Sequence, residues 1–151
     1  MKKLKKNCRV LIADGAKALI FENTGDASQP HLELLQSFDS PNPPSRELGE
    51  ARGGRVYSSA GTNRSAMEVT DFHEMAEEAF IRELAQMLEA DRAKSAFTSL
   101  IIAAPPKALS YWRAYQTDKL EAITIAQIAK DYTKNPSSEL VALLVKELER
   151  E

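Results

Sequence analysis

Two of the short unbroken hydrophobic runs in the chain lie at residues 10–13 and within residues 98–104. A strand with one wet face alternates apolar and polar side chains, so a continuous apolar run of this length predicts a strand covered on both faces. We expect both runs to be fully buried strands, and the first to be the central strand of the sheet.

An antiparallel meander of three strands is predicted around the first run. Asp14 and Gly15 follow it directly, and this pair is a strong hairpin signal because both residues tolerate positive φ. Residues 17–22 then return as a second strand. Residues 31–38 form a third strand, in which leucines alternate with polar neighbours.

A helical period begins at Asp71. Asp71 and Glu74 have the spacing of a capping box, which predicts that the helix starts there. Apolar residues then recur every three or four positions and form one stripe: Phe72, Met75, Ala76, Ala79, Phe80, Leu84 and Leu88. Carboxylates occupy much of the opposite side, which we interpret as a solvated face.

The last third of the chain predicts a helix, a strand and a helix. Pro105 and Pro106 stop the second buried strand and begin a helix, because proline suits the first helical turn. Residues 122–128 form a strand with Ile123 and Ile125 on one face. Asn135-Pro136 precedes the final helix, whose buried stripe is Leu140, Leu143, Leu144 and Leu148.

The resulting order, β-β-β-α-β-α-β-α, predicts a single α/β domain over residues 1–151. The later strands join parallel to the first through right-handed helical crossovers. This gives three layers: a mixed five-stranded sheet in the order 3-2-1-4-5, with helices on both faces. The arrangement is ribonuclease-H-like.

Composition places the chain among globular proteins. It is 43% hydrophobic and 28% charged, and its net charge of −2 argues against a surface that binds nucleic acid everywhere. The single cysteine, Cys8, forms no internal disulfide, which fits a cytoplasmic protein. Four lysines among the first six residues are interpreted as a solvated tail, because the apolar run behind them is interrupted at Asp14, too early for an export signal or a membrane span.

Residues 39–70 follow neither period and contain three prolines and four glycines, so they predict a long loop. The candidate binding residues within it are Arg46, Arg52, Gly53, Gly54, Arg55 and Arg64. Glycine lets the backbone approach a ligand, and the arginine fork grips phosphate, so the loop is a candidate site for RNA or another polyanion. The alternative is a surface loop whose arginines pair with Glu47, Glu50 and the acidic helix.

Asp14 and Asp131 are the weak candidates for metal ligands. Enzymes of this fold hold magnesium ions with several carboxylates at strand ends, but the fourth strand ends in Ala-Ala-Pro-Pro. We therefore interpret Asp14 as the turn residue of its hairpin. No zinc spacing, Walker, dinucleotide or nucleophile-elbow pattern is present. A nuclease is disfavoured, no cofactor is expected, and a non-enzymatic role is favoured.

Short motifs occur in a specific order along nearly the whole chain. They are Val-Leu-Ile-Ala-Asp-Gly-Ala at 10–16, Ile-Phe-Glu at 20–22, Ser-Arg-Glu-Leu at 45–48, Gly54-Arg55 with Ser58, Phe-x-x-Glu-Leu-Ala at 80–85, Leu-Ile-Ile-Ala-Ala-Pro-Pro at 100–106 with Leu109, and Lys130-Asp131 with Thr133. In this combination the chain resembles the host attachment protein family, described as proteins required for attachment to host cells. One departure is Ser-Tyr-Trp-Arg at 110–113, where the family more often has a glycine and a leucine before the arginine.

That family is similar in fold to the middle domain of eukaryotic and archaeal peptide-chain release factors, which carries a Gly-Gly-Gln loop before its long helix. Here Arg-Gly-Gly-Arg at 52–55 lies in the same topological place, with Arg55 where the glutamine would be. Hydrolysis of peptidyl-tRNA depends on that glutamine. The resemblance therefore implies contact with RNA or the ribosome rather than release activity. A protein-binding or adhesion-linked role is the alternative, and a homo-oligomer stays open.

Overall fold

The structure is a computed structural model that describes residues 2–41 and 62–150, with residues 62–70 described by their backbone alone. The strands are β1 (Cys8–Ala13), β2 (Lys17–Asn23), β3 (Leu32–Asp39), β4 (Ser99–Ala103) and β5 (Thr124–Ile128). The helices are α2 (Thr62–Ala93), α3 (Pro106–Tyr115), α4 (Asp118–Ala122) and α5 (Ser137–Glu149). Within these residues the strands form one mixed sheet in the order β3-β2-β1-β4-β5, which confirms the predicted fold class and strand order.

β1 is the central strand, as its unbroken apolar run predicted. It pairs antiparallel with β2 and parallel with β4, so that Val10 lies between Phe21 and Ile101. All six of its residues are buried. The strand therefore has neither a free edge nor a solvated face.

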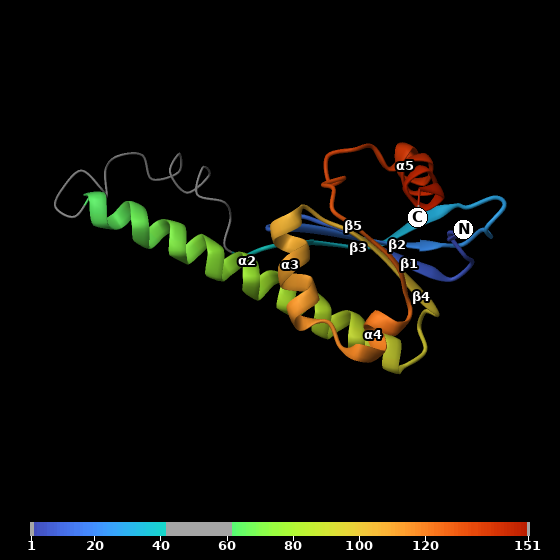
Figure 1. Cartoon of the computed structure of the whole chain (residues 1–151), viewed down its shortest axis with the longest axis horizontal. Coiled ribbons are helices and arrows are strands. Elements are labelled where there is room, and N and C mark those ends of the chain that lie inside the picture. The colour runs from blue at the N-terminus through green and yellow to red at the C-terminus, as the bar shows by residue number, and fades with distance from the viewer. Residues whose placement is uncertain (1, 42–61, 151) are drawn as a thin grey trace.

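Helices cover the two faces of the sheet and complete the three layers (Figure 1). On one face Leu11 packs in a core with Leu88 of α2 and Trp112 of α3. On the other face Val10 packs in a separate core with Leu144 of α5. Successive residues of β1 thus point into different cores, which is what the two-residue period of a strand requires.

α2 begins at Thr62, so the predicted start at Asp71 is wrong and the segment 62–70 is helical rather than part of a loop. No glycine or proline lies between Thr62 and Ala93, and nothing in that stretch ends a helix. The capping-box spacing at Asp71 occurs inside the helix, where the Asp71 side chain is exposed. Although α2 is 32 residues long, none of the described helices is both long and apolar enough to span a membrane.

The segment before β5 also differs from the prediction. The short helix α4 precedes the strand, capped by the Thr117 hydroxyl, which accepts a hydrogen bond of 3.0 Å from the backbone N–H of Leu120. Because the chain leaves α4 before entering β5, Ile123 packs against the α2–α3 core, whereas Ile125 packs against the α5 core. The expectation that the two isoleucines share a face is therefore wrong.

The N-terminal segment is anchored rather than a freely solvated tail. Its lysines are exposed, as expected, but Leu4 is only 2% exposed and packs in the α5 core. The side-chain amide of Asn23 donates hydrogen bonds of 3.0 Å to the carbonyl oxygens of Leu4 and Lys5. The apolar residue between the lysine pairs was the signal for this anchor.

We predict that Leu11→Ala lowers the free energy of unfolding by about 2–5 kcal/mol, because it removes a fully buried side chain from the central strand and leaves a cavity. Urea unfolding followed by circular dichroism measures the change. Leu34→Ala is the matched control, since Leu34 is 49% exposed at the sheet edge and its loss should shift stability by no more than about 0.5 kcal/mol. Equal losses in the two variants would contradict the layered core.

Candidate functional site

The carboxyl ends of β1, β4 and β5 meet at one edge of the sheet, because these three strands run parallel. In open α/β sheets, ligands bind preferentially outside this edge. Asp14 follows β1 and Asp131 lies just beyond β5, and the structure brings them to a shared neighbour. The Thr133 hydroxyl lies 2.6 Å from Asp131 Oδ1 and 3.3 Å from Asp14 Oδ2.

Asp14 makes the hairpin turn, as its sequence context predicted. Its Oδ1 accepts hydrogen bonds from the backbone N–H groups of Ala16, at 2.8 Å, and Lys17, at 2.7 Å. This bonding satisfies turn donors in the manner expected of aspartate. Only Oδ2 is directed away from the turn, toward Thr133.

Asp131 is committed to its own loop in a similar way. Its Oδ1 accepts from the backbone N–H of Thr133 at 2.9 Å as well as from the hydroxyl. Thr133 is buried, with 7% of its surface exposed, and its hydroxyl has a single hydrogen to donate. The three residues therefore link the β1–β2 turn to the β5–α5 connection across the carboxyl edge.

Glu77 of α2 lies over the same turn. A Cβ atom added to Gly15 would come within 2.5 Å of the Glu77 side-chain carboxyl carbon, so the turn and the glutamate are in close contact. Burial raises the pKa of Glu77, the Lys107 ammonium lowers it, and the negative charges of Asp14 and Glu74 raise it. Lys107 itself forms an ion pair of 2.8 Å with Glu74.

This edge consequently carries several carboxylates, and lysines lie beside them: Lys107 near Glu77 and Lys130 next to Asp131. Among residues 2–41 and 62–150, no three His, Cys, Asp or Glu residues are placed to hold a metal ion together. The observed bonds of Asp14 and Asp131 are those of a structural link. Thr133 was quoted in the sequence only as part of a motif; its position two residues after Asp131 was the signal for the aspartate–threonine turn.

The predicted polyanion-binding residues are not among the residues described at the carboxyl edge. Arg46, Arg52, Gly53, Gly54 and Arg55 lie outside the described residues. Arg64 belongs to the first turn of α2, where the backbone alone is described. In Figure 1 the N-terminal part of α2, to which Arg64 belongs, extends well beyond the sheet.

Residues 9–144 match the model of a protein family described as "Protein required for attachment to host cells". The chain belongs to this family. The match confirms the resemblance drawn from the sequence motifs. A search of curated proteins found no match. Among solved structures, the host attachment chain is similar to the crystal structure of an archaeal translation termination factor, aRF1, with 14% identity and a TM-score of 0.42. That similarity covers 97% of this chain but 40% of the termination factor.

We predict that Glu77→Gln stabilises the protein at neutral pH. Because the pKa of Glu77 is raised above its ordinary value of 4.5, the folded state binds this proton more tightly than the unfolded state. Wild-type stability should therefore fall as pH rises through the interval between the two values, and the variant should lack that fall. Urea unfolding at pH 3.5, 5, 6 and 7 tests this.

Glu83→Gln is the control, because it removes the same charge from an exposed position on α2. The gain from Glu77→Gln should be larger than the gain from Glu83→Gln at pH 7 and should shrink toward zero at pH 3.5. An equal gain in both variants would show that only the overall acidity of α2 matters, and not the placement of Glu77 over the turn.

Proposed function

We propose that this host attachment family protein acts in the cytoplasm by binding a partner rather than by catalysis, and that its arginine-rich segment contacts RNA, free or within the ribosome. The observation that carries the proposal is the composition of that segment: Arg46, Arg52, Gly53, Gly54, Arg55 and Arg64. Guanidinium groups bind phosphate through paired hydrogen bonds, and glycines allow the backbone to approach it closely.

The place of the segment in the chain supports this proposal. It joins the end of β3 to the start of α2, and Arg64 lies in the first turn of that helix. The N-terminal part of α2 projects beyond the sheet (Figure 1). A partner as large as a folded RNA could therefore reach this end of α2 without meeting the body of the domain.

The charge distribution supports a contact confined to that end. Residues 71–93 of α2 carry seven carboxylates and two arginines, and the carboxyl edge adds Asp14 and Asp131. An RNA backbone would be repelled from these surfaces over roughly a Debye length, about 8 Å at physiological salt. Asp14 and Asp131 accept hydrogen bonds from the backbone of their own turn and loop, and this bonding gives no support to hydrolysis of nucleic acid.

The second candidate function is protein binding in an adhesion-linked role. It is favoured by apolar side chains that the fold leaves in water. Phe72 is 48% exposed and Met75 is 69% exposed, on neighbouring turns of the same face of α2. Methionine and aromatic side chains are enriched at protein interfaces.

We predict that the protein co-sediments with ribosomes or total RNA at low salt, and that replacing Arg52, Arg55 and Arg64 together by alanine weakens this binding. Each lost phosphate contact should make the slope of log K against log salt shallower by about one unit. Circular dichroism of the purified variant checks that the domain remains folded.

The matched control replaces Lys94, Lys119 and Lys134 by alanine, which removes the same charge from exposed positions in other parts of the chain. This control should retain most of the binding. Absence of binding by the wild type at low salt would remove the RNA proposal. Equal loss in both triple variants would mean that only net charge matters, and would remove the assignment to the arginine segment.

A further inference from the structure

Asn23, at the end of β2, forms hydrogen bonds with two separate segments of the chain and holds them side by side. Its side chain is fully buried, and its amide nitrogen donates to the carbonyl oxygens of Leu4 and Lys5. Its Oδ1 accepts from the backbone N–H groups of Gly25, at 3.0 Å, and His31, at 2.9 Å. The N-terminal segment and the β2–β3 loop are therefore held in fixed relation, with every strong hydrogen-bonding site of the amide used.

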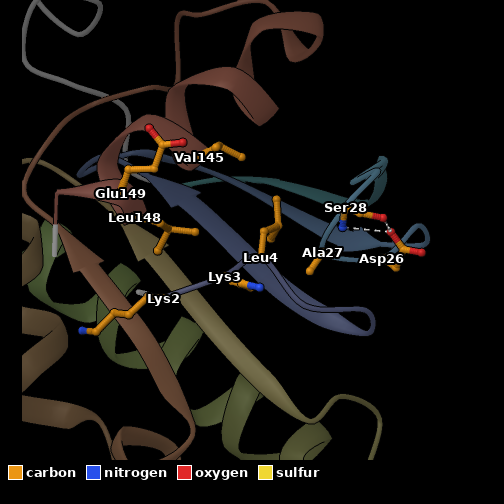
Figure 2. A pocket seen from close by; sticks show the side chains of 9 residues that line it. All are labelled: Lys2, Lys3, Leu4, Asp26, Ala27, Ser28, Val145, Leu148 and Glu149. Carbon is orange, nitrogen blue, oxygen red and sulfur yellow. Dashed lines mark hydrogen bonds between the residues drawn. The ribbon is translucent and has the colours of Figure 1, made fainter.

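A cavity of about 500 Å³ lies between these two segments and the last turns of α5. Figure 2 shows Leu4, Val145 and Leu148 facing its centre, with Ala27 on the opposite wall. Its size is within the range of small-molecule sites, which run from about 300 to 1,000 Å³ and are mostly apolar with a few polar groups. The sequence did not indicate this cavity, because its walls come from both ends of the chain and one loop.

Charged groups of both signs lie at the rim of the cavity. Asp26 Oδ1 accepts three hydrogen bonds, from Ser28 N–H at 3.0 Å, from the Ser28 hydroxyl at 2.8 Å and from Gln29 N–H at 2.8 Å. These bonds turn the carboxylate toward its own loop (Figure 2). Lys2 and Lys3 lie at the other side of the rim, and their side chains leave the chain in opposite directions (Figure 2).

The same two lysines also line a second cavity of about 400 Å³, with Lys5, Thr124 and Ile125. Among the residues that the structure describes, no carboxylate lines this second cavity. Lys2 and Lys3 therefore lie between the two cavities, and the second cavity adds a third lysine, Lys5, beside Thr124 and Ile125. A ligand that complements these two cavities has an apolar body joined to an anionic head.

We propose that this pair of cavities binds a single-chain anionic amphiphile, with its alkyl chain in the larger cavity and its carboxylate or phosphate head at Lys2, Lys3 and Lys5. The alkyl chain covers Leu4, Val145 and Leu148, and removing such apolar surface from water drives the association. Two carboxylates, Asp26 and Glu149, also line the larger cavity, so the head group lies on the side of the lysines that faces the second cavity. The site is distinct from the arginine segment and does not depend on the proposed RNA contact.

The test is isothermal titration of the full chain with monomeric myristate and dodecyl phosphate, with dodecanol as the uncharged ligand. Both anions should bind, and dodecanol should bind more weakly. Lys2→Glu with Lys3→Glu should weaken binding of the anions by about tenfold or more. Ala27→Trp, at an exposed loop position, should fill the larger cavity and abolish binding of all three ligands.

Lys119→Glu with Lys134→Glu is the matched control, since it makes the same charge change at exposed positions that line neither cavity. This control should bind the anions as the wild type does, and so should the variant lacking Arg52, Arg55 and Arg64. Measuring amphiphile binding in the arginine variant shows whether the amphiphile proposal fails independently of the RNA proposal.

Failure of the wild type to bind either anion would overturn the proposal. Equal affinity for the anions in the variant changed at Lys2 and Lys3 and in the control changed at Lys119 and Lys134 would overturn it as well. Vesicles of phosphatidylcholine with phosphatidylglycerol distinguish a bilayer from a free ligand. Binding to these vesicles without binding to monomeric amphiphile would overturn the cavity assignment, because it would reflect adsorption of the lysines to an anionic surface. Retention of binding by Ala27→Trp would likewise exclude the larger cavity as the alkyl site.

Discussion

The burial of β1 on both faces is the constraint on which the rest of the structure depends. Leu11 and Ala13 require the α2–α3 layer, and Val10 and Ile12 require α5, so neither helical layer can be removed without exposing the central strand. The one charged residue in β1, Arg9, lies near its start and is 8% exposed. Its guanidinium group forms ion pairs with Asp91 at 3.2 Å and Glu22 at 3.6 Å, and it lies 4.8 Å from the centre of the Phe97 ring.

The parallel arrangement of β1, β4 and β5 also defines a carboxyl edge and an amino edge of the sheet. At the carboxyl edge, Asp14 and Asp131 share the buried hydroxyl of Thr133, and Glu77 lies over the Asp14 turn with Lys107 near it. At the amino edge, the segment that leads into β1 places Lys2, Lys3 and Lys5 beside the start of β5.

Hydrophobic pattern was sufficient to predict the sheet, and insufficient for features made by single polar contacts. β1 and β4 were recognisable because double burial leaves a continuous apolar run, and their order followed from the short hairpin and the helical crossovers. The link from Thr133 to Asp14 joins residues 119 positions apart, and no local pattern records it. Asn23 is similar: asparagine at a strand end reads as a turn residue, and only the folded chain shows its amide holding the N-terminal segment. The arginine segment stays a prediction, since most of it lies outside the described residues.

Two exposed apolar surfaces, the edge strand β3 and one face of α2, compete as sites for a protein partner. β3 pairs with β2 on one side, and its Leu34 and Leu35 are 49% and 39% exposed. An apolar edge strand of this kind invites pairing with another chain, but the register shifts between Ile20 and Phe21, whose partners are Gln36 and Leu34. Leu35 is thus the extra residue of a β-bulge, which bends the strand and disrupts the ladder that an added strand would have to continue. Because the bulge protects this edge, the exposed face of α2 around Phe72 and Met75 is the better surface for a protein partner, and a partner bound there would lie next to the end of α2 that carries the arginine segment.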